Sequence, residues 1–161
     1  MRVKKHRLST DPYAAMNRGD VRKAFQLFRS QAYAGDASAW LNLGYLFDLG
    51  VGTRRNRRQA MSCYLRAYRS GSGAAASNIA TIYRDEGRPR LQFQWYRRAA
   101  ALRDGDAAVE VAKHYRSGVG VRRDPVLAKK YLQRALRTKY ISRSARAEAR
   151  ILLGSAGRSG R

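Results

Sequence analysis

Side chains suited to acid-base or nucleophilic chemistry are scarce in this sequence of 161 residues. The glutamates are Glu86, Glu110 and Glu148, and the histidines are His6 and His114. General acid-base catalysis requires such a group to be positioned beside a substrate and a partner, and these residues are badly placed for sharing a site. We interpret His114 as an ordinary surface or boundary residue. The pattern therefore predicts a chain that is not an enzyme.

Metal and phosphate sites are not indicated either. No group of cysteines and histidines has the spacing of zinc ligands, so the sequence predicts no metal site and no cofactor. Gly50-x-Gly52 and Gly118-x-Gly120 resemble pieces of phosphate loops, but each follows a helical pattern, so turn formation explains them better. The lone Cys63 can form no internal disulfide, and we expect it to be a small core residue.

The positions of apolar, aromatic and glycine residues repeat along the chain. Residues 36–71 contain Leu43-Gly44, then Phe47, then the first glycine loop. A second copy has the same spacing at Val111, Ala112, Tyr115, Gly118 and Gly120. A middle copy with a shorter loop has Ile79, Ala80, Tyr83, Trp95 and Tyr96. A period in the thirties is typical of a solenoid or repeat array.

Each copy is expected to hold two helices. Ala39, Leu43 and Phe47 fall four apart on one helical face, and the glycines after them supply the positive backbone angles of a chain reversal. Asn56 and Asp124 occupy equivalent positions before the second helices and predict N-caps. Small residues are placed where two helices would cross closely, at Gly44, Ala67, Ala80, Ala99, Ala112 and Ala135.

The boundaries follow from these patterns. Residues 11–154 are predicted to form the repeat domain, with residues 143–153 as a helix that caps its C-terminal end. Residues 1–10 are predicted to be a disordered basic arm, and residues 155–161 a flexible basic tail. No apolar segment typical of a secretory signal follows the basic start, and no window approaches the ~20 apolar residues of a membrane span. We therefore expect a cytoplasmic protein without membrane insertion.

The spacing of a Leu-Gly pair, an aromatic residue, a Gly-x-Gly loop, an aromatic pair and alanines resembles the Sel-one-like repeat family, which is related to tetratricopeptide repeats. The resemblance covers residues 11–154. It implies an all-α, right-handed α-solenoid of antiparallel helix pairs, with about three full units plus partial terminal units. It also implies a non-catalytic adaptor, because family members hold other proteins in complexes, among them bacterial envelope, signalling and virulence proteins.

The charge of the chain bears on its partners. Lys and Arg number 34 against 11 acidic residues, which gives a formal charge of +23. Such a field attracts anionic surfaces, so an acidic protein, nucleic acid and an anionic membrane all qualify. Codon bias in a GC-rich genome explains part of the arginine excess but not the missing acids. Membrane association is the weakest of the three, because nothing supplies an apolar anchor to assist the basic residues.

The basic residues avoid most of the first helices, so two surfaces are predicted. A nearly neutral groove along the first helices would hold a partner protein or peptide at Asn42, Tyr45, Asn78, Thr81, Glu110 and Lys113. A basic edge along the loops and second helices comprises Arg54, Arg55, Arg57, Arg58, Arg97, Arg98, Arg122, Arg123, Lys129, Lys130 and Arg134.

The basic edge leaves two partners open. Arginine forms bidentate hydrogen bonds with carboxylates and phosphates. The edge would therefore select an acidic protein, or bind the phosphates of RNA or DNA without recognising the base sequence. Aromatic residues fall at core spacing rather than among exposed basic residues, which counts against a base-stacking platform. The leading hypothesis is an adaptor with an acidic protein partner. The alternative is a nucleic-acid or ribonucleoprotein accessory protein, and the oligomeric state is left open.

Overall fold

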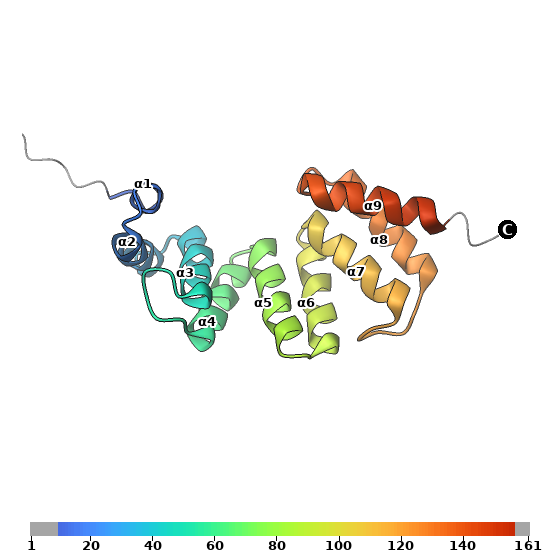
Figure 1. The fold of residues 1–161 in the computed structure, drawn as a ribbon, viewed down its shortest axis with the longest axis horizontal. Helices are drawn as coiled ribbons and strands as arrows, with labels where there is room; N and C mark the ends of the chain where they lie inside the picture. Colours follow the sequence, from blue (N-terminus) through green and yellow to red (C-terminus); the bar gives the residue numbers. More distant parts are fainter. Residues whose placement is uncertain (1–9, 157–161) are drawn as a thin grey trace, which may run out of the picture. The chain divides into compact units, whose positions relative to one another are not determined.

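The computed structural model describes residues 10–156. Of the predicted basic arm (1–10) only Thr10 is described, and of the predicted tail (155–161) only residues 155 and 156, which belong to the last helix. Within residues 10–156 the chain forms nine helices and no strand (Figure 1). The helices are α1 Pro12–Asn17, α2 Val21–Tyr33, α3 Ala37–Leu49, α4 Arg57–Arg69, α5 Gly73–Asp85, α6 Pro89–Ala101, α7 Gly105–Ser117, α8 Pro125–Arg137 and α9 Arg143–Ala156. The all-α arrangement of helix pairs is confirmed. The last helix runs three residues beyond its predicted end at Leu153.

Local side-chain chemistry explains where the helices begin and end. The amide of Gln59 donates to Asn56 at 3.0 Å and that of Leu127 donates to Asp124 at 2.8 Å, so both predicted N-caps are confirmed. Gly50 and Gly118 end α3 and α7 in the left-handed conformation, with φ of 76° and 77°. A residue without a Cβ adopts that conformation at little cost, which explains the glycine at both positions.

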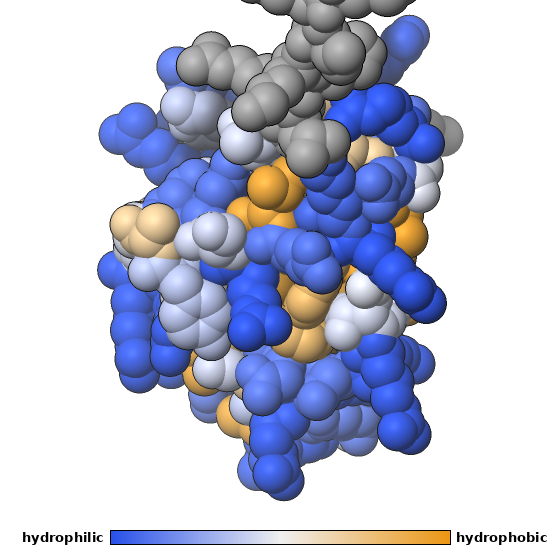
Figure 2. Space-filling model, turned by 90° about the vertical axis from the view of Figure 1, so that its left-hand side faces the viewer, coloured by the Kyte–Doolittle hydropathy of each residue, from blue (hydrophilic) through white to orange (hydrophobic). Residues whose placement is uncertain are grey.

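The chain divides into two compact units, residues 1–67 and 68–161. In the N-terminal unit the core joins α2, α3 and α4. Its buried residues are Phe28, Ala32, Ala39, Leu43, Leu46 and Cys63. Aromatic rings border this core edge to face, as in the pair of Phe25 and Phe47 at 5.2 Å. Hydrophilic residues cover most of the face at α1 and α2 (Figure 2).

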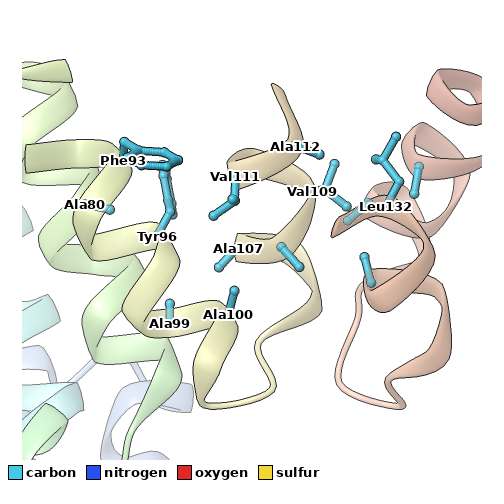
Figure 3. Packing of buried hydrophobic residues seen from close by; sticks show 14 of the residues in the cluster. Ala80, Phe93, Tyr96, Ala99, Ala100, Ala107, Val109, Val111, Ala112 and Leu132 are labelled. Atoms are coloured by element: carbon cyan, nitrogen blue, oxygen red, sulfur yellow. The ribbon is translucent and has the colours of Figure 1, made fainter. Parts of the chain in front are cut away.

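The core of the C-terminal unit lies among α5 to α9 (Figure 3). Alanine occupies the positions predicted for close helix crossing, and Ala80, Ala99, Ala112 and Ala135 are fully buried. Phe93 and Tyr96 supply the larger side chains on α6. Small residues against large ones allow neighbouring helices to interlock at native packing density.

The second glycine of each loop lies against the start of an earlier helix. A Cβ on Gly52 would overlap the carbonyl oxygen of Val21 at the start of α2, and one on Gly120 would overlap that of Pro89 at the start of α6. These glycines also have φ of 71° and 73°. The Gly-x-Gly loops are therefore turns that dock on a preceding helix.

The interpretation of His114 as a surface or boundary residue was wrong, because its side chain is buried. Its Nδ1 lies 2.7 Å from the carbonyl oxygen of Val119 in the glycine loop, and its ring packs near Phe93 and Tyr96. The equivalent residue of α3, Leu46, is also buried. His114 thus ties the loop to α7 from a core position.

Cys63 is buried as predicted, and burial raises the pKa of its thiol to about 11 from 9.0, against an opposing effect of Arg66. The thiolate is the reactive form, and a two-unit increase means about a hundredfold less thiolate at a given pH below 9. We expect iodoacetamide at pH 8 to label the folded chain at least that much more slowly than the urea-unfolded chain, as followed by mass spectrometry. Equal rates in the two states would show that the thiol is exposed.

Among residues 10–156, no helix combines the length and the apolar character needed to cross a bilayer.

Candidate interaction surfaces

Three of the predicted groove residues line a cleft in the C-terminal unit. Asn78 and Thr81 on α5 and Glu110 on α7 line a cavity of about 420 Å³ that α9 also borders. Lys113 pairs with Glu110 at 2.7 Å and with Glu148 of α9 at 3.2 Å. Burial opposes the charge of Lys113, but its bonds to these two carboxylates prevail and raise its pKa. The structure therefore brings together the four groove residues predicted in this unit.

The cleft is acidic, which corrects the expectation of a nearly neutral groove. Its lining includes the carboxylates of Asp104, Asp106, Glu110 and Glu148. Asp104 accepts the hydroxyl of Ser77 at 2.7 Å. Four of the chain's 11 acidic residues therefore gather at one place on a chain of charge +23. We call this the acidic cleft.

The predicted groove residues of the N-terminal unit have a different environment. The side-chain amide of Asn42 donates to the hydroxyl of Tyr13 at 2.9 Å and to the carbonyl of Ser38 at 3.3 Å. Tyr45, one turn further on α3, is half exposed. Asn42 therefore helps to hold α1 on α3, and Tyr45 is the more accessible of the two.

Some residues of the predicted basic edge hold the fold together. Arg55 donates from Nε to the carbonyl of Asp48 at 2.8 Å, and Arg123 donates in the same way to Arg116 at 3.1 Å. Arg57 forms an ion pair with Asp48 at 3.6 Å. The carbonyls at the end of a helix have no partner within the helix, and the repeated arginine satisfies one of them in both loops.

The other basic-edge residues mostly point to solvent. The guanidinium of Arg98 lies 4.5 Å from the ring centre of Trp95, and that of Arg97 lies 5.8 Å from the ring centre of Phe93. These cation–π contacts attract each guanidinium to a ring of α6. The remaining exposed members of the edge are Arg54, Arg58, Arg122, Lys129 and Lys130.

A cationic cleft that the sequence interpretation largely missed lies at the ends of α6 and α8. It has a volume of about 450 Å³, and its charged lining residues are Arg103, Asp104, Arg134, Arg137 and Lys139. Arg134 donates to the carbonyl of Ala100 at 2.9 Å, which joins the two helices. Only Arg134 was in the predicted edge. The sequence did hold a signal for this cleft, because Arg103 and Arg137 stand at the ends of consecutive second helices.

Arg103 has an unusual backbone. Its φ is 66°, and among the described residues no other residue except glycines has a positive φ. Left-handed backbone costs an ordinary residue roughly 1–2 kcal/mol. The carbonyl of Arg103 accepts the hydroxyl of Thr138 at 3.1 Å, so the turn is held in place beside the cleft. Such strain is commonest where function depends on a side chain's position.

Comparison with known proteins decides the family. The model of the Sel1 repeat matches residues 16–36, 37–72, 93–104 and 105–137, which is more than half of the chain. The chain belongs to the Sel1 repeat family. Sel1 repeats generally act as non-catalytic scaffolds for protein–protein interaction, and the solenoid fold expected of them is the one observed.

The individual proteins to which this chain is similar are distant in sequence. DAP3-binding cell death enhancer 1 of Rattus norvegicus is 30% identical over 67 residues, which is 42% of this chain but only 13% of that protein. A crystal structure of a Sel1 repeat protein from Oxalobacter formigenes has a TM-score of 0.77 at 22% identity, covering 98% of this chain and 68% of the other. A protective antigen of uropathogenic Escherichia coli with an SLR fold has a TM-score of 0.68 at 21% identity, covering 97% and 40%. At these identities the structural likenesses show the fold alone.

Proposed function

We propose that this Sel1 repeat chain is a non-catalytic adaptor that binds an acidic segment of a partner protein at the cationic cleft. One observation carries the proposal: four basic side chains, from Arg103, Arg134, Arg137 and Lys139, surround one cavity. Asp104 is the single acid among the residues that line it, and it is already engaged by Ser77 and by the amide of Ala107.

The chemistry of the cleft suits carboxylates. A guanidinium presents a planar set of donors that matches a carboxylate, and charge-assisted bonds of this kind are among the strongest in proteins. The side chain of Arg134 is held by its bond to the carbonyl of Ala100. The backbone of Arg103 is held by the bond from the hydroxyl of Thr138. A pre-positioned side chain loses less entropy on binding, and the cleft gathers four cations around one cavity. We therefore favour this cleft over Lys129 and Lys130 of α8, which do not line it.

The test must separate this cleft from the general positive charge. We suggest the double variant Arg103→Gly and Arg137→Gln, because glycine suits the backbone of residue 103. Binding of a fluorescein-labelled tetraglutamate peptide, followed by anisotropy at physiological ionic strength, should weaken about tenfold or more, which corresponds to a loss of about 1.4 kcal/mol.

The matched control is Lys129→Gln with Lys130→Gln, which removes the same charge from an exposed part of α8 outside the cleft. Its affinity should stay within about twofold of the parent, because these lysines do not line the cleft and act on the peptide only through the general positive field. Equal weakening by the two double variants would refute a specific cleft. A short single-stranded RNA that binds more tightly than tetraglutamate, with a steep dependence on salt, would favour the nucleic-acid alternative instead.

A further inference from the structure

The cationic cleft and the acidic cleft adjoin a third cleft that lies between them. This middle cleft has a volume of about 580 Å³. It shares Arg103, Asp104 and Tyr140 with the cationic cleft. With the acidic cleft it shares Ala74, Asp104, Asp106 and Ser142. We call the three together the charged channel, and all of its lining residues belong to the C-terminal unit.

The charges of the channel are separated by sign. The four cations line the cationic cleft, whereas Asp106, Glu110 and Glu148 line the acidic cleft and Asp104 stands where the clefts meet. Lys113 is the basic residue that pairs with the carboxylates of the acidic cleft, and it compensates only part of their charge. The channel therefore has a positive end and a negative end.

The walls between the two ends are fixed by hydrogen bonds. The amide of Gly105 donates to the carbonyl of Tyr140 at 2.7 Å, which joins the start of α7 to the segment between α8 and α9. The amide of Ser142 donates to Asp106 at 2.7 Å. A Cβ on Gly105 would lie 2.6 Å from Ile141, so these two segments pack closely. These contacts fix the backbone between the two ends and hold Asp106 in place, so the order of the opposite charges along the channel follows from the fold.

We propose that the charged channel binds an extended polypeptide segment in which acidic residues and basic residues stand in separate blocks. The acidic block lies in the cationic cleft, and the basic block lies in the acidic cleft. Asn78 lines the acidic cleft, where its side-chain amide can donate to and accept from the peptide backbone. The hydroxyl of Thr81 beside it already donates to the carbonyl of Ser77 at 3.2 Å. This inference rests on the proposed function and adds the charge order of the partner.

The channel argues for a protein partner over the other anions that a basic chain attracts. Nucleic acids and anionic lipid surfaces carry charge of a single sign at their backbone or headgroups. Either would meet repulsion at Asp106, Glu110 and Glu148 after binding the cationic end. A polypeptide can carry both signs in order, and complementary charge patterns set specificity and register at interfaces.

The experiment compares three labelled peptides on the whole chain. The first joins tetraglutamate to tetralysine through a short glycine linker, the second has the same composition with alternating charges, and the third is tetraglutamate alone. We expect the block peptide to bind about fivefold or more tightly than either of the others. The net charge of +23 opposes any gain from added lysines, so such a gain must come from a local acidic site.

Two variants locate the effect. Glu110→Gln with Glu148→Gln should remove the advantage of the block peptide and leave tetraglutamate binding equal or stronger. The charge-matched control, Asp85→Asn with Glu86→Gln at the exposed end of α5, should keep the advantage. A block peptide no tighter than the alternating one, or an advantage that survives Glu110→Gln with Glu148→Gln, would overturn the channel. In that case the proposed function would still stand if tetraglutamate binding depended on Arg103 and Arg137. If that dependence were also absent, both the channel and the proposed function would be refuted.

Discussion

Replacement of Gly120 by alanine is expected to lower the free energy of unfolding by about 3 kcal/mol. The new Cβ would overlap the carbonyl oxygen of Pro89 and lie 2.6 Å from its carbonyl carbon, so the loop would have to leave the start of α6. The residue also has φ of 73°, which costs alanine roughly 1–2 kcal/mol. Urea unfolding followed by circular dichroism at 222 nm measures the change.

Gly87 provides the matched control in the same unit. Its φ is 66°, but a Cβ there would meet nothing within 4 Å. Gly87→Ala should therefore cost only the backbone strain, about 1 kcal/mol. The difference between the two variants isolates the docking of the loop on α6. Losses of equal size would mean that the glycine serves the turn alone.

The repeat pattern was enough to predict most of the fold. The caps at Asn56 and Asp124 and the glycine helix ends depend on neighbours within a few residues, and such local interactions can be read from sequence. The docking of Gly52 on α2 and of Gly120 on α6 joins segments about thirty residues apart. The Gly-x-Gly pattern is local, so it predicted the turn but not the helix on which the turn docks. For His114, the repeat itself held a signal, because the equivalent Leu46 is a core residue type.

The surfaces were harder to predict, because they combine distant segments. The acidic cleft takes Asp104 and Asp106 from the start of α7 and Glu148 from α9, so a count of charges along each helix found no acidic region. For the basic edge, the sequence interpretation missed local contacts that engage some of its arginines. Arg55 and Arg123 follow helices whose last carbonyls need donors, and a count of charges cannot separate such residues from free ones.

Gly44→Ala is expected to lower the free energy of unfolding by about 2 kcal/mol, although alanine is the better helix former. A Cβ on Gly44 would lie 2.6 Å from two ring atoms of Tyr64, which is 1% exposed and so has little room to move. Gly154→Ala is the control, because that helical glycine has nothing within 4 Å of its Cβ. It should leave stability unchanged or slightly raised.

A second change should reverse the sign of this effect. The equivalent pair in the C-terminal unit is Ala112 and Leu132, both buried (Figure 3), so alanine is accommodated where the facing residue is smaller. In a Tyr64→Leu background, Gly44→Ala should therefore stabilise the chain by about 1 kcal/mol, the difference in helix propensity. The two effects give a coupling of about 3 kcal/mol, the upper end for residues in contact. A full double-mutant cycle by urea unfolding measures it, and additive effects would show that the contact between Gly44 and Tyr64 does not limit residue size there.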